Sequence, residues 1–209
     1  MVRGQVTLGV SAGFSHTSAS VIDEFGIDLE TDPLNGLVVG VVAEFEMTPH
    51  LGLQIGALYA EGGSIITPAE VGVPDVDLGV SFFEIPLFVK VAAGGKVFPY
   101  LLAGGVVGIN TDAHMTARPG PLYFTGDASA IVERFSWALG LGAGVGTTLM
   151  GGVILSVESQ YLFGLSNTLR PGTIEVGNDY WVDDLEIPRG VEYKSRGFRF
   201  QVGLATPVG

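Results

Sequence analysis

The chain has 209 residues, of which 47% are hydrophobic, only 15% are charged and 32 are glycine, and its formal net charge is −12. So much apolar mass excludes a disordered acidic tail, and ten Lys and Arg against 22 Asp and Glu argue against a nucleic-acid partner. The absence of cysteine excludes thiol catalysis, zinc–thiolate sites and disulfides. The length predicts one domain over 1–209.

From residue 6 onward, large apolar side chains recur at every second position, which is the pattern of β-strands. Residues 1–5, before them, lack the apolar segment of a signal peptide, so none is expected. The uncharged stretch 135–157 is long enough for a membrane helix, but it also alternates and contains a glycine turn. We therefore predict an all-β chain with eight strands, at about 6–15, 36–47, 51–60, 81–91, 99–110, 135–147, 153–165 and 196–205.

The connections between these strands alternate in length. Three are short, at 48–50, 92–98 and 148–152. Compact soluble domains rarely contain long structureless connections, whereas outer-membrane barrels have short periplasmic turns and long extracellular loops. The pattern predicts an eight-stranded antiparallel up-and-down transmembrane β-barrel whose four extracellular loops are 17–35, 61–80, 111–134 and 166–195.

The charged residues indicate which face of each strand meets lipid. Eighteen of the 22 acids lie in the four long connections, and the other four share the small-residue face of the strands. A soluble lipocalin-like barrel is the alternative, but its outer face would then be mostly Gly, Ala and Ser. With the apolar face toward lipid, a polar cluster faces the lumen, comprising Glu44, Glu46, Gln54, Glu84, Lys90, Glu158, Gln160, Arg199 and Gln201.

The lumen cluster has two interpretations. It is either a polar pathway or gate, or a structural filling, because the interior of an eight-stranded barrel is just wide enough to be filled by side chains. Buried carboxylates and cations would then pair to offset their desolvation.

On the lipid-facing side, aromatic residues gather near the long-loop ends of the strands, as in the girdle of an outer-membrane barrel. The loop tip at Tyr180 and Trp181 is predicted to be a contact surface, with packing among the loops as the alternative. The expected partners are outer-membrane lipid or lipopolysaccharide and a protein at the extracellular loops. The predicted aromatic girdle consists of Phe14, Tyr59, Phe83, Phe135, Trp137, Phe163 and Phe198.

Several short motifs resemble the small outer-membrane β-barrels called the porin family, similar to OmpX and to the barrel part of OmpA. They are Phe83-Glu84-Ile85-Pro86-Leu87 followed by Lys90, Pro99-Tyr100 with Ala103-Gly104, Gly140-Leu141-Gly142-Ala143-Gly144, residues 161–167 and Arg196-Gly197-Phe198. The resemblance implies the outer membrane of a Gram-negative bacterium and no cofactor. Two features depart from it: the chain ends without a terminal aromatic residue, and no peptidoglycan-binding domain follows the last strand.

Two sets of residues could carry catalysis or metal binding. His16 and Ser18 have a spacing that could place a base beside a nucleophile, at the end of the first strand and on its lumen side. The acids at 75–77 and 179–186 are oxygen donors of the kind that Ca²⁺ prefers, but no twelve-residue calcium loop is visible. We therefore expect no metal and no enzymatic activity.

The predicted function is structural or adhesive, through the display of loops on a stable membrane barrel. The first alternative is a narrow cation-preferring porin for small solutes. The second is an outer-membrane lipid-modifying enzyme, which depends on His16 and Ser18 alone.

Overall fold

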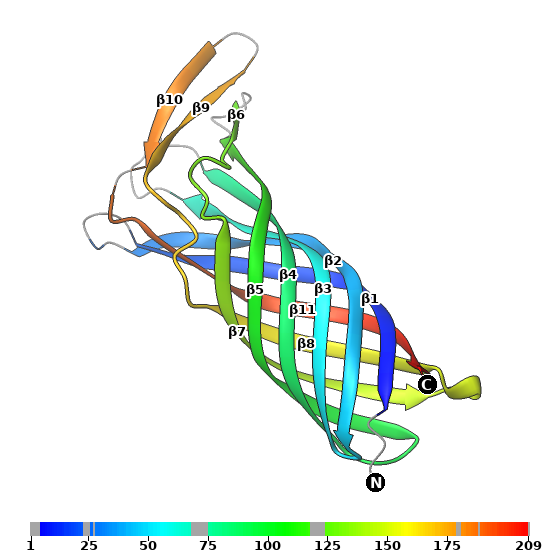
Figure 1. The fold of residues 1–209 in the computed structure, drawn as a ribbon. Helices are drawn as coiled ribbons and strands as arrows, with labels where there is room; N and C mark the ends of the chain where they lie inside the picture. Colours follow the sequence, from blue (N-terminus) through cyan, green and yellow to red (C-terminus); the bar gives the residue numbers. More distant parts are fainter. Residues whose placement is uncertain are drawn as a thin grey trace.

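The computed structural model describes residues 5–22, 26, 28–67, 75–117, 124–178, 181–187 and 189–208, most of which lie in antiparallel β-strands (Figure 1). Eight strands form a closed ring: β1 (Val6–Ile22), β2 (Asp28–Thr48), β3 (Leu51–Thr67), β4 (Val76–Ala92), β5 (Val97–Ala117), β7 (Phe135–Thr148), β8 (Ile154–Gly164) and β11 (Glu192–Val208). Three shorter strands extend the sheet: β6 (Phe124–Asp127), β9 (Gly172–Asn178) and β10 (Trp181–Ile187). No helix in these ranges has the length and apolar character needed to cross a membrane.

The ring closes where β1 pairs with β11 in a continuous register from Val6↔Val208 to Ile22↔Glu192. It is also staggered. A path through directly paired residues that leaves β1 at Leu8 returns to it at Ser18, ten residues further along. The strands of a staggered eight-stranded barrel are tilted to its axis, and its interior is just wide enough for side chains to fill. The predicted fold class is confirmed.

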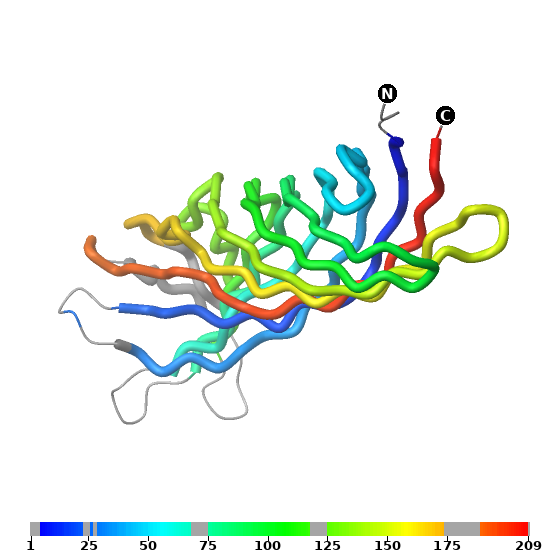
Figure 2. The backbone as a smooth tube through the Cα atoms, turned by 90° about the horizontal axis from the view of Figure 1, so that it is seen from below, coloured from blue at the N-terminus to red at the C-terminus, as the bar shows by residue number. Residues whose placement is uncertain are grey.

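The two ends of the barrel differ. In Figure 2 the turn between β7 and β8 (yellow) projects at the end where β1 begins and β11 finishes. At the other end the β9–β10 hairpin projects beyond the ring (Figure 1). A single residue pair, Thr125↔Gly177, joins this hairpin to β6, which in turn pairs with β5.

The ring strands run further toward the long-loop end than the sequence analysis predicted. β1 continues to Ile22 and β2 begins at Asp28, so most of 17–35, predicted to be a loop, is strand. The same holds for the end of β3, the start of β4 and the end of β5. These extensions still pair with their neighbours, which is why their backbone groups are satisfied away from the membrane.

The extensions were missed because the apolar positions change sides at the girdle. Within β1, the apolar residues up to Phe14 point outward, whereas Ala19 and Val21 beyond it are buried inside at 1% and 2% exposure. Their outward neighbours there are Ser18 and Ser20. The barrel thus has an apolar exterior along one part of its length and an apolar interior along the rest, the arrangement of a soluble barrel.

Candidate functional site

The lumen holds an ion pair that crosses it. Arg199 of β11 lies with its Nη2 atom 2.7 Å from Oε2 and 3.0 Å from Oε1 of Glu84, on β4. These two strands are not neighbours in the ring, so the pair ties opposite walls together. Arg199 is 3% exposed and Glu84 8% exposed. Burial removes the hydration of both charged groups, and the attraction between the two charges offsets that loss.

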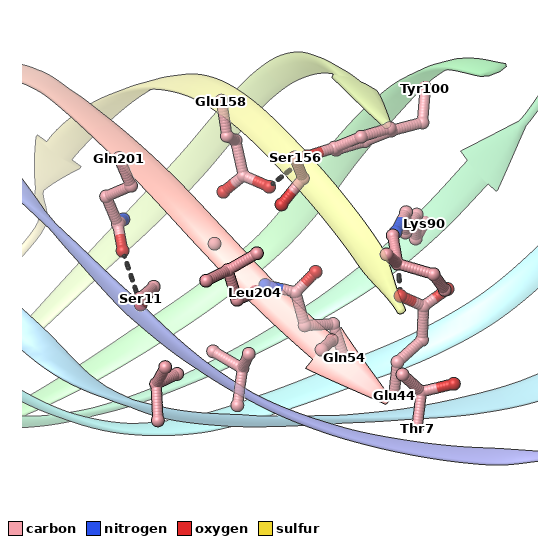
Figure 3. Close-up of a pocket in the computed structure, with 15 residues that line it drawn as sticks. Thr7, Ser11, Glu44, Gln54, Lys90, Tyr100, Ser156, Glu158, Gln201 and Leu204 are labelled. Carbon is pink, nitrogen blue, oxygen red and sulfur yellow. Dashed lines mark hydrogen bonds and ion pairs between the residues drawn. The ribbon is translucent and has the colours of Figure 1, made fainter. Parts of the chain in front are cut away.

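A second polar group lies nearer the short-turn end (Figure 3). Lys90 Nζ is 2.7 Å from Glu44 Oε2 and 4.2 Å from the centre of the Tyr100 ring, a cation–π distance. The Tyr100 hydroxyl donates to Glu158 Oε2 at 3.0 Å, and Gln160 donates to the other carboxylate oxygen of Glu158. This group therefore links side chains from β2, β4, β5 and β8 across the lumen.

The remaining members of the predicted cluster lie at its margins. Gln201 accepts a hydrogen bond from Ser11 at 3.0 Å, between neighbouring strands β11 and β1 (Figure 3). Gln54 is half-buried and lines the same cavity as Lys90. Glu46 is half-buried and lines an open vestibule of about 400 Å³ at the short-turn end, which Glu44 and Lys90 also border.

Apolar side chains fill much of the lumen between these polar groups. Phe88 is 0% exposed and packs with Tyr100, Leu102 and Val106. A Cβ atom at Gly140 would lie 2.6 Å from the Phe88 ring. The ring therefore fits in this position because residue 140 has no side chain. A second apolar cluster is formed by Val38, Leu58 and Ala60.

Small cavities lie among these side chains. One of about 60 Å³ borders Lys90 and Glu158, and two more, of about 60 and 50 Å³, border Glu84. Arg199 lines the smallest of them, and its Nε and Nη1 atoms are buried without a partner among the described residues. Each cavity has room for a few water molecules, which buried donors of this kind normally bind.

A plug of packed side chains lies inside the barrel at the long-loop end. Ala128, Ile131 and Val132, from the connection between β6 and β7, are at most 2% exposed. They pack with Leu169 and Tyr193 against the inner faces of β1, β4 and β5. Backbone hydrogen bonds from Arg170 to Ile131 and from Glu133 to Thr168 hold this segment, which the sequence analysis placed in a loop. Its signal was a lone apolar pair at 131–132, too short to show a period.

Tyr193 lies at the base of this plug. Its hydroxyl is 2.9 Å from Ser64 Oγ, across the ring from β11 to β3. Burial disfavours the charged phenolate and raises the pKa of Tyr193 to about 12.

The seven residues of the predicted aromatic girdle all lie exposed on the outer face, at 38–56%. Two further rings join them. The ring of Phe200 stacks on that of Phe14, with 5.1 Å between the ring centres. The centre of the Tyr161 ring lies 4.4 Å from that of Phe163 and 4.7 Å from that of Phe198. The predicted girdle included neither Phe200 nor Tyr161, although both lie within predicted strands.

The predicted placement of His16 and Ser18 on the lumen side was wrong. His16 is exposed and lies opposite Phe198, on the outer face. Nor does it act on Ser18: its Nδ1 is 2.8 Å from Asn35 Oδ1, and Ser18 Oγ is 3.1 Å from Thr31 Oγ1. Among the described residues, the hydrogen bond between base and nucleophile that such catalysis needs is therefore not formed at His16 and Ser18.

Of the predicted contact surface at Tyr180 and Trp181, the structure describes only the backbone of Trp181. Tyr180 lies outside the described residues, and Trp181 begins β10, paired with Asn178. Within the described part of the chain, no group of three or more His, Asp or Glu residues is placed to hold a metal ion.

Comparison with known proteins places this architecture. The family model for "Outer membrane protein beta-barrel domain" matches residues 2–170, and no curated protein sequence matches the chain. The outer membrane protein OprG from Pseudomonas aeruginosa is similar, with a TM-score of 0.55 at 13% identity over 97% of this chain and 95% of that one. A major outer membrane protein from Thermus thermophilus has a TM-score of 0.55 at 14% identity, over 99% and 100%. At these identities the likeness is one of fold.

Proposed function

Because the chain belongs to the outer membrane protein beta-barrel domain family and lies in the bacterial outer membrane, we propose that it acts through the surface it presents outside the membrane, in a structural or adhesive role. The barrel is the anchor, and the strand extensions and the β9–β10 hairpin are the displayed part. No step of this proposal needs a reaction or a solute pathway.

The filled lumen is the observation that carries the proposal. From the vestibule toward the long-loop end, the lumen is occupied by the Phe88 cluster, then the Glu84–Arg199 pair, then the plug around Ile131. Moving an ion past them would mean breaking a buried ion pair and displacing packed apolar side chains, which interiors resist.

Planar-bilayer recording is the direct test. We expect the refolded protein, once its folding is verified by heat-modifiable electrophoretic mobility, to produce no single-channel steps. Reproducible cation-selective steps from folded protein would contradict the proposal and favour the porin alternative. Glu44, Glu84 and Glu158 would then be the residues to neutralise, because acidic lumen groups favour cations.

The displayed sheet has a free edge at β10. In the described sheet this strand pairs with β9 alone, so its other side carries unpaired backbone donors and acceptors. Such an edge accepts an extended segment of a partner. The sequence of β10 includes Asp183, Asp184 and Glu186, and like charges disfavour pairing with a second β10. A cationic partner segment suits this edge.

Removing the hairpin tests the display role separately from the barrel. Thr173 and Glu186 are directly paired, so residues 174–185 can be replaced by the two-residue turn Asn-Gly. We expect a change of less than about 0.5 kcal/mol in the free energy of unfolding, because a single pair joins the hairpin to β6.

The functional readout is the attachment of vesicles carrying the protein to polylysine-coated beads, at several salt concentrations. The shortened protein should attach more weakly than the intact one, and the difference should shrink at high salt. Equal attachment of the two folded proteins at every salt concentration would contradict a display role for the hairpin.

A further inference from the structure

A patch of cations lies on the outer face of the barrel, immediately beyond the aromatic girdle. On β11, Lys194 and Arg196 precede Phe198 at alternate positions and are exposed. Both point the same way as Phe198, because successive side chains of a strand alternate between its faces. Their direct partners on β1 are Ser18 and Ser20, so hydroxyl groups lie beside the cations.

Arg134 extends this patch by two strands. It precedes Phe135 at the start of β7, and its guanidinium lies 5.9 Å from the centre of that ring. β7 and β11 both pair with β8, so all three cations belong to one sector of the barrel. We call Arg134, Lys194 and Arg196 the rim patch.

The arginines of the rim patch have no acidic partner among the described residues, in a chain with 22 acids and ten Lys and Arg. Lys194 does pair, with Glu192 at 2.8 Å. Neither arginine's position follows from packing, because both side chains are exposed. The described part of the barrel thus presents two exposed guanidinium groups without a carboxylate partner, on one sector of an acidic chain.

The level of the patch indicates which external anion these two arginines would bind. Aromatic girdles mark the boundary between hydrocarbon and headgroups, so side chains one or two positions beyond Phe198 and Phe135 lie among the headgroups. Basic residues at this level attract anionic lipid, and guanidinium groups match phosphate with two parallel hydrogen bonds. We propose that the rim patch binds the phosphate groups of an outer-leaflet lipid, with Arg134 and Arg196 as the main ligands.

Binding of lipid A to the detergent-refolded protein, followed by native mass spectrometry, tests this site. The double variant Arg134→Gln/Arg196→Gln should bind bis-phosphorylated lipid A about tenfold more weakly than the unaltered protein. Lys96→Gln is the matched control, because Lys96 is an exposed cation in the turn between β4 and β5, at the opposite end of the barrel. It should bind as the unaltered protein does.

Two further arms identify the ligand. Lipid A without its phosphates should bind the unaltered protein about as weakly as the intact lipid binds the double variant, and inorganic phosphate should not displace the intact lipid. Equal affinity of the double variant, equal affinity for the dephosphorylated lipid, or displacement by inorganic phosphate would each overturn the proposal. The proposed display function is unaffected by these outcomes, because the β9–β10 hairpin takes no part in the rim patch.

Discussion

Replacing Arg199 with methionine is expected to lower the free energy of unfolding by about 3–5 kcal/mol. The change leaves the Glu84 carboxylate buried in the lumen without a cation to offset its lost hydration. It also removes the ion pair that connects β4 and β11 across the lumen. Urea unfolding of the protein in lipid vesicles, followed by fluorescence of its two tryptophans, measures the effect.

Two comparisons isolate the buried pair. Lys194→Met breaks an exposed ion pair with Glu192 and should cost less than about 1 kcal/mol. The double variant Arg199→Met/Glu84→Leu removes both buried charges and should recover most of the loss, because apolar residues of similar volume often replace a buried pair without penalty. A loss for Arg199→Met no larger than that for Lys194→Met would show that the pair contributes nothing to stability.

Gly104→Ala should be similarly damaging, for a steric reason. A Cβ atom at Gly104 would lie closer than 3.0 Å to the backbone oxygen of Leu87 on the paired strand β4, and backbone cannot move aside as a side chain can. We expect a loss of about 3 kcal/mol or more, or failure to fold, since overpacking of a close contact between strands has no local remedy.

The adjacent glycine is a matched control for this substitution. A Cβ atom at Gly105 would have its nearest neighbour at 3.8 Å, the backbone oxygen of Ala138, which is ordinary contact. Gly105→Ala should therefore stay within about 0.5 kcal/mol of the unaltered protein. Both variants are measured by heat-modifiable mobility and urea unfolding, and equal behaviour of the two would mean that β4 and β5 can separate at Gly104.

The membrane part of the fold was predictable because one simple rule governs it. Apolar residues such as Leu8 and Val10 at every second position mark the lipid face, and polar residues on the opposite face, such as Glu84 and Lys90, must then point inward. The choice of partners inside the lumen was not predictable. Whether Arg199 meets Glu84 or Glu158 depends on the ten-residue stagger of the ring, and no local feature of the sequence reveals it.

Beyond the girdle the same rule fails, because the environment of the outer face changes from lipid to water. In β1 the apolar residues up to Phe14 face outward, whereas Ala19 and Val21 face inward. A prediction that requires all apolar residues of a strand to share one face therefore ends β1 too early. His16 was placed on the wrong side for a related reason. It continues the outward-facing series of Phe14, and a polar residue in that series was taken for a lumen residue. The plug at Ile131 packs against residues that are distant in the sequence, and no periodic pattern in the segment indicates those contacts.

The seam between β1 and β11 has a consequence for the order of events during folding. Val6 and Val208 are partners although about 200 residues separate them, so the first strand of the ring must wait for the last strand of the ring before it can pair. Contacts between such distant residues form slowly. Until then both seam strands expose backbone groups that lipid cannot satisfy, at a cost of several kcal/mol each. A chain truncated before β11 is therefore expected to remain outside the bilayer, however many of its other strands have already paired.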